Sequence, residues 1–191
     1  MLKFLGGLAA ALLLILIVGF AYVRLGLFDP RADIAVGSIE SRIAMPSLDA
    51  AVDRRAGNAK NPLQPTEATL VAASKVYQAN CASCHGDIRR THAPLAESLY
   101  PRAPQFLEDT PDMPENQNYY IIEHGVRLTG MPAWKNVLSE EQVWQLTTLL
   151  SHIDKLPPQV SDAWKAAAGA APVADAEMKG TMQARQEMPM R

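Results

Sequence analysis

The two cysteines of this chain lie three residues apart, and a histidine follows the second of them directly. The segment reads Cys81-Ala82-Ser83-Cys84-His85. Each thiol at this spacing can form a thioether with one vinyl group of a haem, while the adjacent imidazole reaches the iron. The segment therefore predicts one covalently attached haem c, with His85 as an axial ligand of the iron.

Other uses of a Cys-x-x-Cys pair fit this chain less well. A zinc site needs further ligands, and the remaining histidines stand at no usual spacing for one. A thioredoxin-like dithiol belongs to a strand and helix setting, and the sequence carries no convincing strand pattern. A disulfide between Cys81 and Cys84 stays open as the alternative if no haem is bound.

Residues 4–23 form a run of 20 residues without a charge, flanked by Lys3 and Arg24. A helix of this length rises about 30 Å, which matches the hydrocarbon core of a bilayer. The run predicts an N-terminal membrane anchor over residues 1–28. A cleaved signal peptide is the alternative, because Gly19 and Ala21 offer small residues to a signal peptidase, although the apolar part of such signals is usually about 7 to 15 residues.

Two further segments have the composition of chain without a packed core. Residues 29–65 collect prolines, glycines and asparagines without a sustained apolar period, which is typical of a flexible spacer. At most a short helix from Ser47 to Arg55 is expected there. After Pro158 the chain becomes rich in alanine and then in polar residues and methionine, so residues 157–191 are expected to form a mobile, disordered tail.

Residues 66–156 show helical periodicity and predict an all-α domain of three or more helices. The expected helices run from Thr66 to Cys81, from Asp112 to Gly125 and from Ser139 to about Ile153. Ser139 and Gln142 have the spacing of a capping box, as do Asp112 and Glu115. The apolar inventory is thin for a domain of this size, so a buried porphyrin is expected to complete the core.

Met131 is the expected second axial ligand of the iron. It lies in the loop Thr129-Gly130-Met131-Pro132, between the second and third expected helices, where the chain would cross the opposite face of the haem. Gly130 permits a close backbone approach and Pro132 stiffens the turn.

Other ligands to the iron stay open as alternatives. Met113 precedes the second expected helix and would reach the iron only if residues 86–110 wrapped differently. The remaining histidines are expected at the surface or at helix ends; they are His92, His124 and His152.

These segments together resemble the monohaem class I cytochromes c of bacterial respiratory chains. The resemblance rests on residues 81–86, on residues 125–134 around Gly130-Met131-Pro132, and on residues 141–144. It covers residues 66–156, about half of the chain.

The resemblance implies a set of contacts in the fold and at the haem. The first and third expected helices would cross, with Tyr77 against the Trp144 side, and His85 and Met131 would ligate the iron. A proline carbonyl would accept a hydrogen bond from the imidazole of His85. The candidates for this carbonyl are Pro94, Pro101 and Pro104, and those for partners of the haem propionates are Arg102, Arg127 and Trp134.

An iron with both axial positions held by protein has no open site for a substrate, which indicates one-electron transfer rather than catalysis. Peroxidase or gas-sensor activity would require Met131 to dissociate. The formal net charge of −2, with eleven acidic and seven basic residues in residues 66–156, gives no basic surface for nucleic acid.

Haem c is attached outside the cytoplasm, so the expected location is a single-pass anchor in the bacterial inner membrane with the haem domain in the periplasm. The expected partners are the membrane and redox proteins such as a quinol or dehydrogenase complex and a terminal oxidase. The alternative is a haem c subunit bound permanently in a larger membrane oxidoreductase complex.

Overall fold

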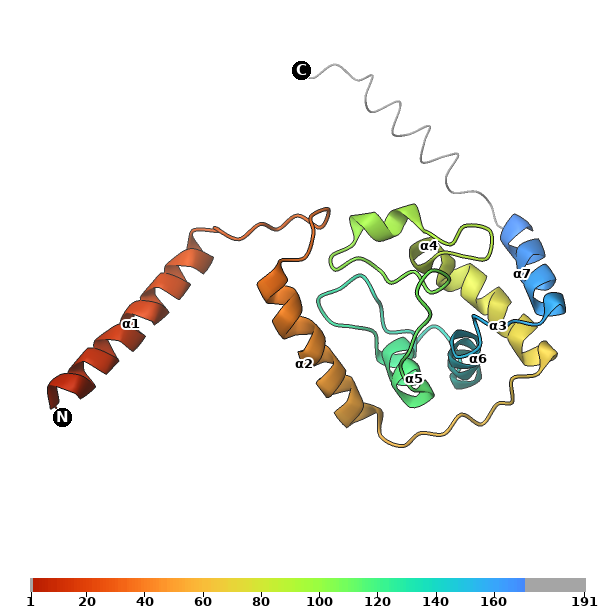
Figure 1. Cartoon of the computed structure of the whole chain (residues 1–191), viewed down its shortest axis with the longest axis horizontal. Helices are drawn as coiled ribbons and strands as arrows, with labels where there is room; N and C mark the ends of the chain where they lie inside the picture. The colour runs from red at the N-terminus through yellow and green to blue at the C-terminus, as the bar shows by residue number, and fades with distance from the viewer. Residues whose placement is uncertain (1, 171–191) are drawn as a thin grey trace, which may run out of the picture. The chain divides into compact units, whose positions relative to one another are not determined.

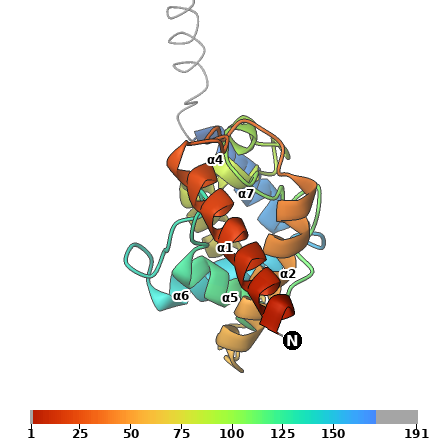
Figure 2. The ribbon, with the colours of Figure 1, turned by 90° about the vertical axis from the view of Figure 1, so that its left-hand side faces the viewer.

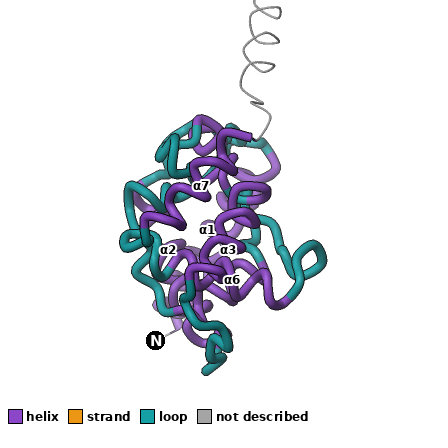
Figure 3. Tube along the Cα trace, turned by 90° about the vertical axis from the view of Figure 1, so that its right-hand side faces the viewer, coloured by secondary structure: helices purple, strands orange, loops and turns teal. Residues whose placement is uncertain are grey.

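The computed structural model describes residues 2–170, which form seven α-helices and one 3₁₀ helix, with no β-strand in this range (Figures 1 and 3). The elements are α1 (Leu2–Arg24), α2 (Ser38–Ala56), α3 (Glu67–Asn80), α4 (Ala82–His85), η1 (Pro94–Ser98), α5 (Glu115–His124), α6 (Glu140–Leu150) and α7 (Pro158–Ala170). The predicted all-α fold class is confirmed. The chain divides after Ile34 into a small N-terminal unit and a larger second unit.

The N-terminal unit consists of α1 and the residues that follow it. The segment Lys3–Arg24 is long and apolar enough to cross a membrane, and none of its apolar window is buried within the protein. A signal sequence near the N-terminus can pass the same test of length and composition, so a membrane anchor and a signal sequence both stay open.

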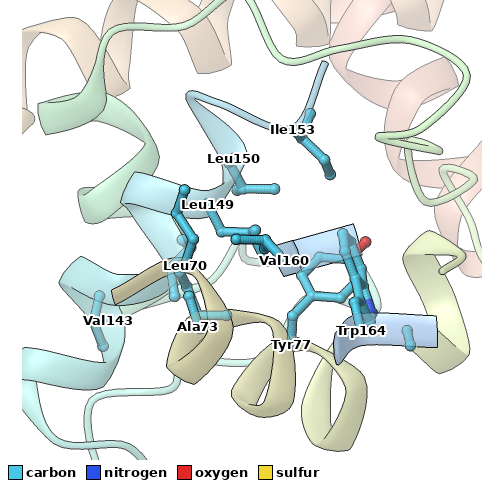
Figure 4. Packing of buried hydrophobic residues seen from close by; sticks show 12 residues of the cluster. Leu70, Ala73, Tyr77, Val143, Leu149, Leu150, Ile153, Val160 and Trp164 are labelled. Atoms are coloured by element: carbon cyan, nitrogen blue, oxygen red, sulfur yellow. The ribbon is translucent and has the colours of Figure 1, made fainter. Parts of the chain in front are cut away.

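The core of the second unit lies where α3 contacts both α6 and α7 (Figure 4). Leu70, Ala73 and Tyr77 lie on one face of α3 at positions i, i+3 and i+7, and all three are buried. The residues that α6 and α7 contribute to this cluster include Val143, Leu146, Leu149, Leu150, Val160 and Trp164. The crossing of α3 and α6, which the resemblance implied, is therefore present.

The starts of α3 and α6 follow from side-chain caps that the sequence predicts correctly. Thr66 Oγ1 accepts a hydrogen bond from the Thr69 amide at 3.2 Å. Ser139 Oγ accepts from the Gln142 amide at 3.2 Å, and Gln142 Oε1 accepts from the Ser139 amide at 2.9 Å. These bonds satisfy backbone donors that have no partner inside the helix.

The predicted start of the second helix is wrong. In the described chain α5 begins at Glu115, with Pro114 in the N-cap position and no side-chain cap. Asp112 therefore lies two residues outside the cap position, too early to close a capping box with Glu115. The end of α5 at Gly125 agrees with the prediction.

The predicted mobile tail is wrong for Pro158–Ala170, which forms α7. Val160 and Trp164 lie four residues apart on one face of α7, and both have an exposed fraction of 0%. Pro158 is the first residue of the helix, a position at which proline is well tolerated. Residues 171–191, the rest of the predicted tail, lie outside the described residues.

Trp164 also replaces a contact that the resemblance implied. Its indole ring packs edge-on against the Tyr77 ring, with centroids 5.1 Å apart. Trp144, the expected neighbour of Tyr77, instead stacks on Tyr119 with centroids 4.0 Å apart. The difference arises from α7, because this helix brings Trp164 to the position that the resemblance gives to the Trp144 side of α6.

The prediction of a flexible spacer over residues 29–65 is wrong for about half of its length, because α2 spans Ser38–Ala56 and includes Pro46. A proline inside a helix lacks one hydrogen-bond donor and disfavours the helix locally. Packing outweighs this cost, since Val52 and Ala56 are buried and α2 lies against α5 (Figures 1 and 2). The expected short helix from Ser47 to Arg55 is only the second half of α2.

Polar contacts also attach α2 to the rest of the second unit. Gln117 Nε2 donates to Asp53 Oδ1 at 3.1 Å, and Asn116 Nδ2 donates to the Gly57 carbonyl at 2.6 Å. The Tyr100 hydroxyl donates to the Glu40 carboxylate. The helix α2 is therefore a component of the second unit rather than a loose connection.

Candidate haem-binding site

The Cys-x-x-Cys-His motif folds as a single helical turn. The helix α3 ends at Asn80, and the Cys81 carbonyl accepts from the amides of Cys84 at 3.1 Å and His85 at 2.9 Å. Residues at i, i+3 and i+4 of a helical turn share one face, so Cys81, Cys84 and His85 lie on the same side. Both cysteines are free thiols in the structure.

The imidazole of His85 is oriented by a backbone carbonyl. Its Nδ1 lies 2.8 Å from the carbonyl oxygen of Pro104. Because a carbonyl oxygen only accepts, Nδ1 must be the donor, and the lone pair of the neutral ring then lies on Nε2. Among the three candidate prolines, the structure assigns this contact to Pro104.

The surroundings of His85 favour the neutral ring that a metal ligand requires. Burial lowers the pKa of His85, and the hydrogen bond to Pro104 acts in the opposite direction. The Phe106 ring stacks on the imidazole with centroids 4.4 Å apart and an angle of 9° between the planes. The hydrogen bond to Pro104 and the stacking on Phe106 together fix the orientation of the His85 ring.

Burial also affects the first cysteine. It raises the pKa of Cys81 to about 12, and the neighbouring Cys84 acts in the same direction. Cys81 is thus a protonated thiol in a mostly apolar setting.

Gln105 connects three separate segments of the site, and sequence reasoning missed it. Its Nε2 donates to the Cys84 carbonyl at 2.9 Å and to the Ala103 carbonyl at 2.7 Å. Its Oε1 accepts from the Ala93 amide at 2.7 Å. This buried amide holds the loop of Pro104 against the motif, and nothing in the local sequence marks a glutamine for such a role.

The side of the motif that faces the core is held by Tyr77 and Gly86. The Tyr77 hydroxyl donates to the His85 carbonyl at 3.3 Å, and burial raises the pKa of Tyr77 so that it stays a neutral donor. Gly86 has φ of +76°, and a Cβ there would lie 2.3 Å from the Thr91 carbonyl oxygen. Only glycine fits this turn without moving the backbone.

The loop that carries Met131 is closed by its own hydrogen bonds. Thr129 Oγ1 donates to the Val126 carbonyl at 2.7 Å and accepts from the Met131 amide at 3.1 Å. The Val126 amide donates to the Met131 carbonyl at 3.1 Å. Gly130 lies against the Leu99 side chain, which a Cβ would approach to 2.8 Å. The backbone of Met131 is therefore fixed, and its side chain is half-buried.

The comparison with protein families agrees with this geometry. Residues 68–150 match the family model of cytochrome C oxidase, cbb3-type, subunit III, which describes a class I cytochrome c domain. This part of the chain is a monohaem cytochrome c domain. No curated protein and no solved structure matches the chain.

The cytochrome c domain carries covalently bound haem c, and the donor set at the motif fits that group. One helical turn presents two free thiols and an imidazole whose Nε2 lone pair is available. Thioether bonds require free thiols, and iron ligation requires a neutral ring nitrogen. When bound, haem c supplies an iron that gains or loses one electron.

Most other ionisable residues considered from the sequence have partners elsewhere in the cytochrome c domain. Arg102 pairs with Glu97 at 2.8 Å, and His92 lies between Glu97 at 3.1 Å and Glu108 at 3.4 Å. His124 pairs with Glu123 at 3.2 Å, and His152 Nδ1 contacts the Thr148 carbonyl at 2.9 Å. Among the described residues, no group of three or more His, Cys, Asp or Glu could hold a metal ion.

The remaining candidates from the sequence lie around the Met131 loop or before α5. Arg127 is exposed, and Trp134 is half-buried against the core, with its amide donating to the Ile122 carbonyl at 3.2 Å. The carbonyl of Met113 accepts from Asn118 Nδ2 at 3.0 Å.

Proposed function

We propose that this chain is a membrane-anchored electron carrier whose single haem c is attached through Cys81 and Cys84 and ligated by His85 and Met131. The observation that carries the proposal is the 2.8 Å contact between His85 Nδ1 and the Pro104 carbonyl. That contact leaves Nε2 as the ligating atom and increases the basicity of the imidazole.

The assignment of Met131 as second ligand is supported by the loop that carries it. The hydrogen bonds of Thr129 and Val126 hold the Met131 backbone in one conformation. A thioether is a soft, neutral ligand that favours ferrous iron, which gives a comparatively high reduction potential. His85 and Met131 together leave no axial position for a substrate, so the role is electron transfer and not catalysis.

The proposed location is the periplasmic side of a bacterial inner membrane. The segment Lys3–Arg24 supports a single-pass anchor by its length and composition, and haem c is attached outside the cytoplasm. Anchoring keeps the haem at a high effective concentration near membrane partners. The proposed partners are a quinol or dehydrogenase complex as donor and a terminal oxidase as acceptor.

Optical spectra of membranes that contain the full chain test this function. A sharp reduced c-type spectrum that carbon monoxide leaves unchanged is expected, because protein holds both axial positions. Binding of carbon monoxide to the reduced protein would contradict the proposed ligation and favour an open iron with sensor or peroxidase activity. If no haem spectrum is found, the proposed haem attachment is wrong, and a disulfide between Cys81 and Cys84 becomes the favoured interpretation.

A second candidate function is a haem subunit bound permanently in a membrane oxidoreductase. The match of residues 68–150 to an oxidase subunit family favours it. Extraction in mild detergent separates the two candidates. A carrier leaves the membrane as a small species, whereas a subunit co-purifies with other chains in a fixed stoichiometry.

A further inference from the structure

The helix α2 has apolar residues on two separate faces, which lie about 130° apart around its axis. One side packs on α5 through the buried residues Val52 and Ala56. The other side carries four apolar residues at the spacing i, i+4, i+7 and i+11, which is the spacing of a single helical face. These four residues form the outer stripe of α2: Ile39, Ile43, Pro46 and Ala50.

No part of the second unit that the structure describes covers the outer stripe. The exposed fraction is 74% for Ile39 and 64% for Ile43, and Pro46 and Ala50 are also exposed. Single exposed apolar side chains are ordinary, but two isoleucines one turn apart on the outer side of a docked helix form a continuous apolar surface.

We propose that the outer stripe lies on the lipid bilayer surface and thereby orients the cytochrome c domain relative to the membrane. This inference rests on the proposed anchoring by α1. Only 13 residues, 25–37, connect Arg24 at the end of α1 to Ser38 at the start of α2. A flexible segment of this length spans about 20 Å on average, and at most about 45 Å when fully extended. The anchor therefore keeps the outer stripe close to the bilayer surface.

The size of the stripe favours lipid over a protein partner. A stable protein interface involves about 20 to 30 residues on each side, and the outer stripe offers four. The strength of adsorption to a bilayer scales with the apolar area that is buried. A membrane anchor raises the effective concentration of the outer stripe at the bilayer surface, so a small apolar area is sufficient for binding.

Charged residues beside the stripe fit the headgroup region. Arg42 and Arg54 are exposed and lie on either side of the stripe. Neither has an ion-pair partner in residues 2–170, so both are available to lipid phosphates. Asp49 and Asp53 are exposed on the same side of the stripe as Arg42, so the docking depends on apolar contact more than on net charge.

A site-specific fluorescence experiment tests the proposal on the full chain with haem attached. The thiols of Cys81 and Cys84 are consumed by haem, so an introduced cysteine is the one free thiol. Ile43→Cys places an NBD fluorophore on the outer stripe, and Ala44→Cys places it about 100° around the same helix at another exposed position. The c-type spectrum reports that each variant is folded.

The labelled chains are reconstituted into vesicles of mixed zwitterionic and anionic phospholipid. Doxyl-labelled lipid quenches fluorophores in the bilayer, and iodide quenches those in water. The expected result is severalfold stronger lipid quenching at residue 43 than at residue 44, with the reverse order for iodide. Flotation of the vesicles reports separately whether the chain is anchored.

Three other outcomes would contradict the proposal, each at a different step. A chain that floats with the vesicles but shows equal iodide quenching at residues 43 and 44 overturns the bilayer docking and leaves the anchor intact. A chain that does not float overturns the proposed anchor and, with it, this inference. Protection of residue 43 only in native membranes that contain partner complexes overturns lipid as the occupant and indicates a protein.

Discussion

The indole Nε1 of Trp164 donates a hydrogen bond to Gln78 Oε1 at 3.0 Å, which joins α7 to α3 across 86 residues of sequence. Gln78 Nε2 in turn lies 3.2 Å from Asp87 Oδ2, and Asp87 begins the turn that follows the haem motif. The Asp87 carboxylate also accepts from the amides of Arg89 and Arg90. The helix α7 is therefore connected, through Gln78, to the turn that follows His85.

Trp164→Ala is expected to lower the free energy of unfolding of the cytochrome c domain by about 3–5 kcal/mol, because it empties a fully buried site. Trp164→Phe keeps most of the volume and loses the bond to Gln78, so a smaller loss is expected. Lys165→Ala, on the exposed side of α7, is the matched control. Chemical denaturation followed at the haem absorption measures all three, and an unchanged midpoint for Trp164→Ala would contradict the role of α7.

The sequence predicts the helices whose signals are local. Thr66 and Ser139 cap helices because their side chains satisfy amides three residues away, and that spacing is visible in the sequence. The sequence predicts the second half of α2 but not its first half, and it does not predict α7. Trp164 of α7 packs on Tyr77, a contact between distant residues that has no local signature.

The site shows the same division between local and distant information. The motif at Cys81 to His85 follows from the sequence because its chemistry requires a fixed spacing. The choice of Pro104 over Pro94 and Pro101 depends on how the loop before α5 folds, which three similar prolines cannot reveal. Gln105 was missed because its partners are three backbone groups in three segments.

Replacement of Gln105 by leucine is expected to lower the free energy of unfolding by about 2–4 kcal/mol. The substitution removes the acceptor of the buried Ala93 amide and the donor to the half-buried Cys84 and Ala103 carbonyls, so polar backbone groups lose a partner. Gln159→Leu, at an exposed position of α7, is the control and should change stability by less than about 0.5 kcal/mol. Similar denaturation curves for the two variants would show that Gln105 does not hold the loop.

Alanine substitutions at two glycines with positive φ separate backbone strain from steric clash. A Cβ at Gly86 would lie 2.3 Å from the Thr91 carbonyl oxygen, whereas a Cβ at Gly57, with φ of +60°, meets no atom within 4 Å. Gly57→Ala is expected to cost about 1–2 kcal/mol from strain alone. Gly86→Ala must also move the backbone beside His85, so a larger loss of stability and a lower yield of haem-containing protein are expected.

Gly57→Ala is the control for Gly86→Ala. Pyridine haemochrome spectra measure the yield of covalent haem in the two purified variants, and denaturation curves measure their stability. Equal behaviour of Gly57→Ala and Gly86→Ala would mean that the turn after the motif can relax, and it would remove the argument that Gly86 is required for close backbone approach.

The packing of α2 on α5 gives a prediction about the stability of the cytochrome c domain. Val52→Ala is expected to lower the free energy of unfolding by about 1–2 kcal/mol, because it removes buried apolar volume between the two helices. Ala44→Ser, at an exposed position of the same helix, is the control. If Val52→Ala leaves the unfolding midpoint of the haem domain unchanged, α2 is independent of that domain.

Met131→Ala is expected to convert the iron to high spin while the haem stays covalently attached. The substitution removes the proposed sulfur ligand but leaves the attachment turn and the contact of His85 with Pro104 in place. Met113→Ala is the matched control, because Met113 is the alternative ligand and lies in a separate loop before α5. Optical and electron paramagnetic resonance spectra of the ferric proteins measure the spin state, and haem staining of denatured protein reports the covalent bond. A low-spin spectrum in Met131→Ala with a high-spin spectrum in Met113→Ala would transfer the ligand role to Met113, since only the loss of a true axial ligand opens the sixth coordination position.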